Sequence, residues 1–252
     1  MNKPFFLALL VFINVTTAND LTVAVAANFS RPMAELVDDF NKLTGKNVIV
    51  ISGSTGKLAA QITHGAPVDV FLSADTTTIN LLVQQGLLDQ QPVEVYASGK
   101  IALWSNILTE HELNNCLVDS RLQLSCFKIL SIANPKLAPY GFAAKEFLAK
   151  SYQDLQQQRR LVFAESINQA FQFTLSGNAD LGLVAVSQLI NNQLVRQKHY
   201  IEINSSLYSP IEQSLAVVSR SNNKVLASDF IEYLGSKRGQ DIIESFGYRV
   251  NR

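Results

Sequence analysis

Cysteine and histidine are scarce in this chain of 252 residues, which holds two cysteines and three histidines. Cys116 and Cys126 are too far apart for a C-x-x-C pair, and His64, His111 and His199 lack H-x-x-x-H spacing. Zinc sites and dithiol redox sites need clusters of such ligands or thiols. We therefore expect no metal-cation ligands and no cofactor.

Net charge is lacking as well, because 21 Lys and Arg residues face 21 Asp and Glu residues. A protein that binds nucleic acid in general needs a basic face to contact phosphates. We expect no nucleic-acid partner, and any preference for an anion must come from a local site.

Long apolar runs are missing after the first residues of the chain. Lys3 provides a positive start, residues 5–15 an apolar core, and Thr16-Thr17-Ala18 a small-residue cleavage site. This pattern predicts a signal peptide at 1–18, with an apolar core too short to span a membrane. No cysteine follows the cleavage site closely enough to carry a lipid anchor. We expect a soluble, exported protein that begins at Asn19 and resides in the periplasm.

The two cysteines are an even number in a chain that we expect to be exported. A disulfide between Cys116 and Cys126 would close a short loop and stabilise the fold by about 3 kcal/mol in the chain-entropy model. The alternative is a pair of buried thiols.

Buried strands and amphipathic helices alternate along the whole chain. Leu21–Ala26 reads as an apolar strand, for example, and Phe29, Met33 and Leu36 then recur at helical spacing. Such alternation predicts an α/β fold with βαβ units and parallel sheets. In these folds ligands bind beyond the carboxyl ends of strands, where the following helices begin.

Four junctions of this kind stand out: Ala27-Asn28, Ser54-Thr55, Pro139-Tyr140-Gly141 and Ser166-Ile167. Two lie early and two late in the chain, which is expected if two lobes face each other across a cleft. Small polar residues at a helix start place free N–H groups and hydroxyls where an anion can bind. The alternative interpretation is that these residues are ordinary helix N-caps.

Catalytic motifs are largely absent. Gly53-Ser54-Thr55-Gly56-Lys57 is not a phosphate-binding Walker loop, because Ile51 stands where the first glycine is needed. There is no G-x-S-x-G motif, and no histidine neighbours Ser54 or Ser166 in sequence. Uncharged donors at the four junctions suit a fully ionised oxyanion, whereas hydrogen phosphate would also need an acceptor.

With these residues in hand, the chain resembles the periplasmic molybdate-binding proteins of ABC transporters over essentially its whole mature length. The most specific segment is Gly65-Ala66-Pro67-Val68-Asp69-Val70-Phe71-Leu72-Ser73-Ala74-Asp75. The order and spacing of four further segments also fit the family: 25–29, 52–61, 133–141 and 177–184.

The resemblance implies a two-lobed type II periplasmic binding protein fold. Each lobe is a mixed, mainly parallel sheet flanked by helices, with the ligand cleft between the lobes. We expect lobe I at 19–97 and 208–252, and lobe II at 98–207, joined by two crossover strands.

The resemblance also implies a set of ligand-binding residues. These are Asn28 (side chain and N–H), Thr55 (hydroxyl and N–H), Tyr140 (N–H) and Ile167 (N–H), with Ala27 and Ser54 as neighbours that could join them. One branch of the family uses a tyrosine hydroxyl where Ala185 stands here, so another donor must replace it.

The expected function is to capture molybdate, and tungstate as well, and to deliver it to the membrane permease of an ABC importer. We expect a monomer without enzymatic activity. The alternatives are a receptor for sulfate or another small oxyanion, an exported hydrolase with Ser54 or Ser166 as nucleophile, and a surface protein that binds no small anion.

Overall fold

The structure is a computed structural model that describes residues 20–89, 94–149, 152–196 and 199–250. The predicted signal peptide and its cleavage site lie outside these residues. No helix in the described part of the chain is long and apolar enough to cross a membrane.

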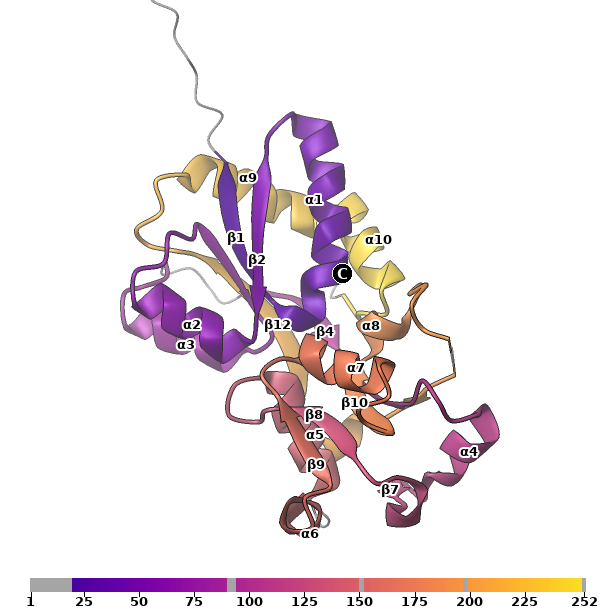
Figure 1. Cartoon of the computed structure of the whole chain (residues 1–252). Helices are drawn as coiled ribbons and strands as arrows, with labels where there is room; N and C mark the ends of the chain where they lie inside the picture. Colours follow the sequence, from indigo (N-terminus) through magenta and orange to yellow (C-terminus); the bar gives the residue numbers. More distant parts are fainter. Residues whose placement is uncertain (1–19, 90–93, 150–151, 197–198, 251–252) are drawn as a thin grey trace, which may run out of the picture.

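Two five-stranded sheets organise the molecule (Figure 1). The first sheet contains, in spatial order, β2 (Val48–Gly53), β1 (Leu21–Ala26), β3 (Val70–Ser73), β12 (Ile211–Val217) and β4 (Glu94–Gly99). The second sheet contains β11 (Ile201–Glu202), β5 (Ile101–Trp104), β10 (Leu181–Ala185), β8 (Leu130–Ala133) and β9 (Leu161–Ala164). A short hairpin is formed by β6 (Leu117–Val118) and β7 (Arg121–Leu122).

We call the first sheet with its helices lobe I and the second sheet with its helices lobe II. The helices of lobe I are η1 (Ala27–Phe29), α1 (Ser30–Thr44), α2 (Thr55–Thr63), α3 (Thr76–Gln84), α9 (Lys224–Gly235) and α10 (Lys237–Ser245). Those of lobe II are α4 (Glu110–Asn115), η2 (Leu124–Cys126), α5 (Pro139–Leu148), α6 (Tyr152–Gln157), α7 (Ile167–Leu175) and α8 (Val186–Leu189). η3 (Ser205–Leu207) lies on the return to lobe I.

The predicted α/β class and two-lobed fold are confirmed, with one difference in detail. Each sheet combines two parallel pairings with two antiparallel ones, so neither is mainly parallel. The reason lies in the strands next to the crossings between the sheets. The chain enters lobe II between Gly99 and Ile101 and returns before Ile211, and the strands that begin there, β5 and β12, pair antiparallel with their neighbours.

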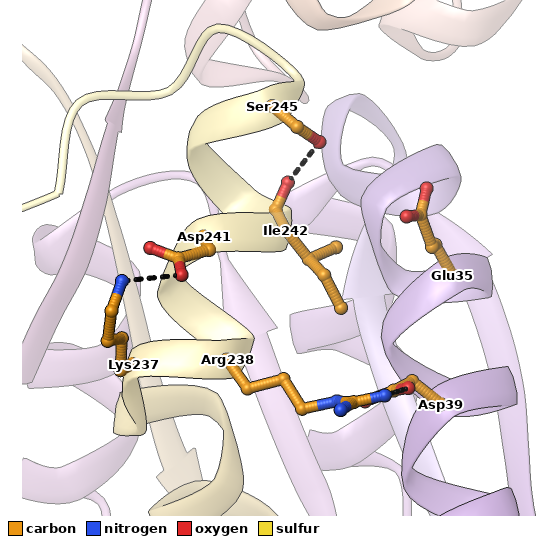
Figure 2. A pocket seen from close by; sticks show the side chains of 7 residues that line it. All are labelled: Glu35, Asp39, Lys237, Arg238, Asp241, Ile242 and Ser245. Atoms are coloured by element: carbon orange, nitrogen blue, oxygen red, sulfur yellow. Dashed lines mark hydrogen bonds and ion pairs between the residues drawn. The ribbon is translucent and has the colours of Figure 1, made fainter.

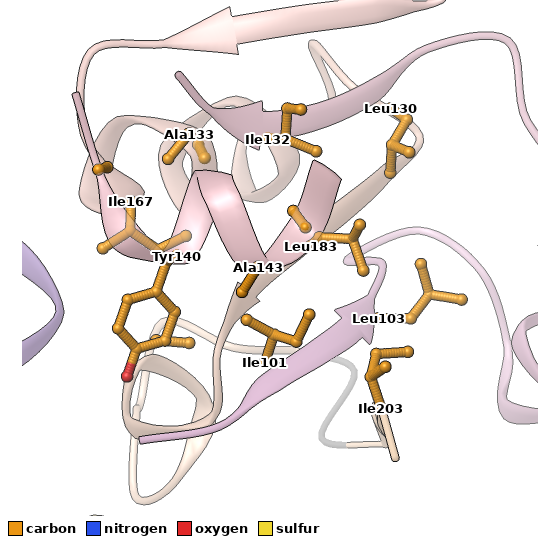
Figure 3. Close-up of a cluster of buried hydrophobic side chains, with 14 of the residues drawn as sticks. Ile101, Leu103, Leu130, Ile132, Ala133, Tyr140, Ala143, Ile167, Leu183 and Ile203 are labelled. Carbon is orange, nitrogen blue, oxygen red and sulfur yellow. The ribbon is translucent and has the colours of Figure 1, made fainter. Parts of the chain in front are cut away.

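Lobe I has an apolar core on each face of its sheet, because successive side chains along a strand point to opposite faces. Val23 and Val25 of β1 pack with α1, α9 and α10, whereas Ala24 packs with α2 and α3 on the other face. The side chains of a strand point alternately to the two faces, so a continuous apolar strand needs cover on both. In lobe II one large cluster lies under α5 and α7, and Figure 3 shows Tyr140 and Ile167 at one end of it.

Both cysteines are free thiols in this structure. Cys116 is buried at the end of α4 and its thiol donates to the carbonyl oxygen of Glu112 at 3.2 Å. Burial, together with the neighbouring Cys126, raises the pKa of the Cys116 thiol to about 12. The structure contains no bond between Cys116 and Cys126, and their disulfide stays a prediction.

Candidate functional site

A small cavity lies where the two lobes meet. Its volume is only about 10 Å³. Its wall is formed by Ala26, Ala27, Asn28, Ser54, Thr55, Ala74, Ala138, Pro139, Tyr140 and Ile167. All six residues that the sequence analysis selected are in this wall, and each is at most 3% exposed. A larger hollow of about 450 Å³ shares Thr55, Ala138 and Pro139 with the cavity and opens toward solvent.

The cavity wall is built from the starts of four helices. β1 runs into η1 at Ala27, β2 into α2 at Thr55, and in lobe II α5 and α7 begin at Pro139 and Ile167. The first N–H groups of a helix have no acceptor within the helix. The N–H groups of Thr55, Tyr140 and Ile167 belong to this class, and the helix dipoles add positive potential at the same place.

Ser54 is placed as an N-cap but does not cap its helix. Its backbone is extended, with φ −68° and ψ 146°, and its side chain accepts no hydrogen bond from α2. The hydroxyl is buried and has no hydrogen-bond partner among the described residues. A buried hydroxyl without a partner costs about 1–3 kcal/mol, so its position in the cavity wall indicates a ligand.

Thr55 adds a second hydroxyl to the cavity wall, and its oxygen is held by a hydrogen bond. Its Oγ1 accepts a hydrogen bond from the N–H of Ala74 at 3.1 Å, which leaves the hydroxyl hydrogen available for another acceptor. The next residue, Gly56, donates its N–H to the carbonyl oxygen of Leu137 in lobe II at 2.9 Å. A Cβ at Gly56 would lie 3.1 Å from that oxygen, so the lobes approach closely here.

Asn28 lies in the cavity wall, but its side-chain amide is engaged elsewhere. Nδ2 donates to Gln213 Oε1 at 2.7 Å and to Tyr248 Oη at 2.9 Å. An amide nitrogen carries two hydrogens, and both are used by these bonds. The expected donation from the Asn28 side chain to a ligand does not fit this geometry, whereas the expectation for its N–H is unaffected.

None of the described residues in the cavity wall carries a formal charge. Among the described lining residues only Tyr140 can ionise, and burial raises its pKa well above the usual value for tyrosine. The charged groups lie outside the cavity: Lys57 pairs with Glu165 across the lobes at 2.7 Å, and both side chains are exposed. Ala185 is buried at the end of β10, donates its N–H to Gln188 Oε1 at 3.0 Å, and is not in the cavity wall.

The hydrolase alternative finds no support in the described residues. None of the three histidines lines the cavity. The His64 ring bonds to the carbonyl oxygen of Ala60, His111 to Asn115, and His199 to Asn114. Ser166 caps α7 by accepting from the N–H of Gln169 at 3.3 Å and does not line the cavity.

A second hollow, between α1 and α10, is an open groove of charged residues (Figure 2). Arg238 forms a two-point ion pair with Asp39 at 2.5 and 2.6 Å, and Lys237 pairs with Asp241 at 2.8 Å. The hydrogen bonds from Arg238 lower the pKa of Asp39 to about 2. Because these charges satisfy one another, the groove is a poorer candidate for a ligand site than the cavity.

Some residues of the cavity wall are not among the ligand-binding residues that the sequence predicts. Ala74, Ala138 and Pro139 line the cavity without a polar side chain. What marks them in the sequence is their position. Ala74 lies just after β3, and Ala138 and Pro139 directly precede Tyr140. Small residues at these points let the backbones of the two lobes approach.

Comparisons with known proteins agree with this architecture. The family model described as bacterial extracellular solute-binding protein matches residues 21–249. The molybdate-binding protein ModA of Azotobacter vinelandii is 38% identical over 234 residues, which cover 92% of this chain and 90% of the relative. ModA of Rhodobacter capsulatus is 34% identical over 233 residues, covering 92% and 88%.

The solved structure of the Azotobacter vinelandii periplasmic molybdate-binding protein superposes with a TM-score of 0.82 at 32% identity. The match covers 92% of this chain and 100% of that one. The predicted resemblance is confirmed, and so is the prediction of a binding protein rather than an enzyme, since the family and these relatives are described as binding proteins. The chain belongs to the family of bacterial extracellular solute-binding proteins.

Proposed function

We propose that this protein captures molybdate and delivers it to the membrane permease of an ABC importer. The observation that carries the proposal is the buried, uncharged cavity between the lobes, with the unpartnered Ser54 hydroxyl in its wall. The molybdate-binding relatives support the choice of ligand.

The proposed ligand shell consists of neutral donors. N–H groups come from Asn28, Thr55, Tyr140 and Ile167, and hydroxyls from Ser54 and Thr55. The N–H of Ala27 is the proposed replacement for the donor that Ala185 lacks. Hydrogen bonds to an ionised oxyanion are about twice as strong as neutral ones, so a dianion can be held without a salt bridge. Hydrogen phosphate would bring a proton that finds no acceptor in such a shell.

Capture requires the lobes to open and close. The proposed boundaries are 19–97 with 208–252 for lobe I and 98–207 for lobe II, with the hinge at the two crossings. Donors come from both lobes, so the ligand contacts its full shell only in the closed form and stabilises that form. The ion pair of Lys57 and Glu165 and the bond from Gly56 to Leu137 span the lobes and would form on closure.

We further propose that the shell accepts tungstate, which has the same charge and tetrahedral shape as molybdate, and that the protein works as a monomer in the periplasm. Light scattering after size-exclusion chromatography would test the monomer. Mass spectrometry of the exported protein would test cleavage after Ala18.

Calorimetric titration of the purified chain from Asn19 onward tests the function. Molybdate and tungstate should bind tightly at one site, while sulfate and phosphate give no heat at the same concentrations. Preferential binding of sulfate would support an oxyanion receptor but contradict the proposed specificity for molybdate. No binding of any of the four would overturn the proposal.

A further inference from the structure

The buried hydroxyl of Tyr248 forms hydrogen bonds with Asn28, a residue of the cavity wall, and with Ser187. Its Oη lies 2.9 Å from the carbonyl oxygen of Asn28 and 3.2 Å from Ser187 Oγ, and it accepts from Asn28 Nδ2 at 2.9 Å. The hydroxyl is protonated at neutral pH, as in any tyrosine, and burial raises the pKa of Tyr248 further. Tyr248 therefore contacts the cavity residue Asn28 from two sides, at its backbone carbonyl and at its amide.

This contact also joins the lobes. Tyr248 belongs to lobe I, where its ring packs edge-on against Phe29 at 5.1 Å. Ser187 is in α8 of lobe II, and its hydroxyl donates to the carbonyl oxygen of Asn28 at 2.9 Å. The peptide group that carries the carbonyl of Asn28 is thus held by one side chain from each lobe.

We propose that Tyr248 is a positioning residue for the oxyanion site. Its hydroxyl, with Gln213, holds the Asn28 amide away from the ligand and fixes the backbone of Asn28, so that the N–H of this residue is presented to the anion. The Asn28 side chain then serves the scaffold and is not a ligand donor. This inference rests on the proposed function.

Tyr96 offers a matched control. Its ring also packs edge-on against Phe29, at 5.2 Å, and it is as buried as Tyr248. Its hydroxyl, however, has no hydrogen-bond partner among the described residues. Tyr96→Phe and Tyr248→Phe remove the same atom from the same aromatic cluster, but only the second removes a contact with Asn28.

The test is a double-mutant cycle on the dissociation constant for molybdate, measured well below the melting temperature of each variant. Tyr248→Phe should weaken binding about tenfold, while Tyr96→Phe stays within about twofold of the wild type. Asn28→Ala should also weaken binding, and the double variant Tyr248→Phe with Asn28→Ala should be no weaker than the weaker single variant. If Asn28→Ala does not fold, Asn28→Ser takes its place in the cycle.

The outcomes separate this inference from the function on which it rests. A wild-type protein that binds no molybdate overturns both. A wild-type protein that binds molybdate, together with additive losses in the double variant, overturns the role of Tyr248 alone. Equal affinity of Tyr248→Phe and Tyr96→Phe does the same, since it shows that the contacts with Asn28 do not reach the ligand.

Discussion

The junctions β2–α2 and β9–α7 look alike in sequence and differ in what their serines do. In both, a serine with an extended backbone lies shortly after the end of a strand and directly before a nine-residue helix. Ser166 uses its hydroxyl to cap α7, whereas the Ser54 hydroxyl is buried without a partner in the cavity wall. An N-cap position therefore does not by itself tell whether a serine stabilises its helix or awaits a ligand. The hydrogen-bond partner of the hydroxyl distinguishes these two roles.

The largest effect is expected when a negative charge replaces each serine. Ser54→Asp would place a carboxylate in the neutral cavity, about 4 Å from a dianion, where each charge pair costs about 4 kcal/mol at an effective dielectric constant of 20. We expect molybdate affinity to fall at least about a thousandfold. Ser166→Asp keeps a good N-cap outside the cavity and should bind within about tenfold of the wild type. Similar losses in the two variants would remove the distinction between the junctions.

A smaller loss is expected from Thr55→Ala, which removes one hydroxyl donor to a charged ligand. The affinity for molybdate should fall by about 1–3 kcal/mol in calorimetric titration. Thr63 is a control in the same helix, because its hydroxyl donates to the carbonyl oxygen of Ala59 on the exposed side. Thr63→Ala should leave affinity unchanged, and an unchanged affinity in Thr55→Ala would take Thr55 out of the ligand shell.

Removing each of the two hydroxyls should affect folding stability differently. Ser166→Ala loses an N-cap and should lower the free energy of unfolding by about 1 kcal/mol in urea. Ser54→Ala removes a buried, unpartnered hydroxyl and should leave the stability of the ligand-free protein unchanged or raise it. If Ser54→Ala destabilises the ligand-free protein as much as Ser166→Ala does, Ser54 is a cap after all.

The smallest effect is expected from pH. Tyr140 is the one residue in the described part of the cavity wall that can ionise, and its raised pKa keeps it neutral well beyond its usual range. Molybdate affinity should therefore be flat from about pH 6 to 9. A change of tenfold within this window, seen by titration in matched buffers, would show that a charged group of the protein contacts the ligand.

Much of the fold and of the cavity could be predicted from the sequence, because the signals are local. The apolar run of β1 and the helical spacing that follows it mark where one element ends and the next begins. Asn28, Ser54, Thr55, Tyr140 and Ile167 stand at such boundaries, and in α/β folds these boundaries gather at one edge of a sheet.

Contacts between distant segments could not be predicted. Asn28 bonds to Ser187, Gln213 and Tyr248, which are 159, 185 and 220 residues away along the chain. Nothing near Asn28 in the sequence indicates that its amide is already engaged, so the sequence and the family resemblance alone predict a side chain that binds the ligand. The different roles of Ser54 and Ser166 could not be predicted either, because tertiary structure determines the hydrogen-bond partner of each hydroxyl.

The most direct test of the central claim is a crystal structure with molybdate, with anomalous diffraction recorded at the molybdenum edge. We expect a single anomalous peak in the cavity, within hydrogen-bond distance of the Ser54 and Thr55 hydroxyls and of the N–H groups of Tyr140 and Ile167. A peak in the groove between α1 and α10, or none in the cavity of a protein saturated with molybdate, would contradict the assignment of the site.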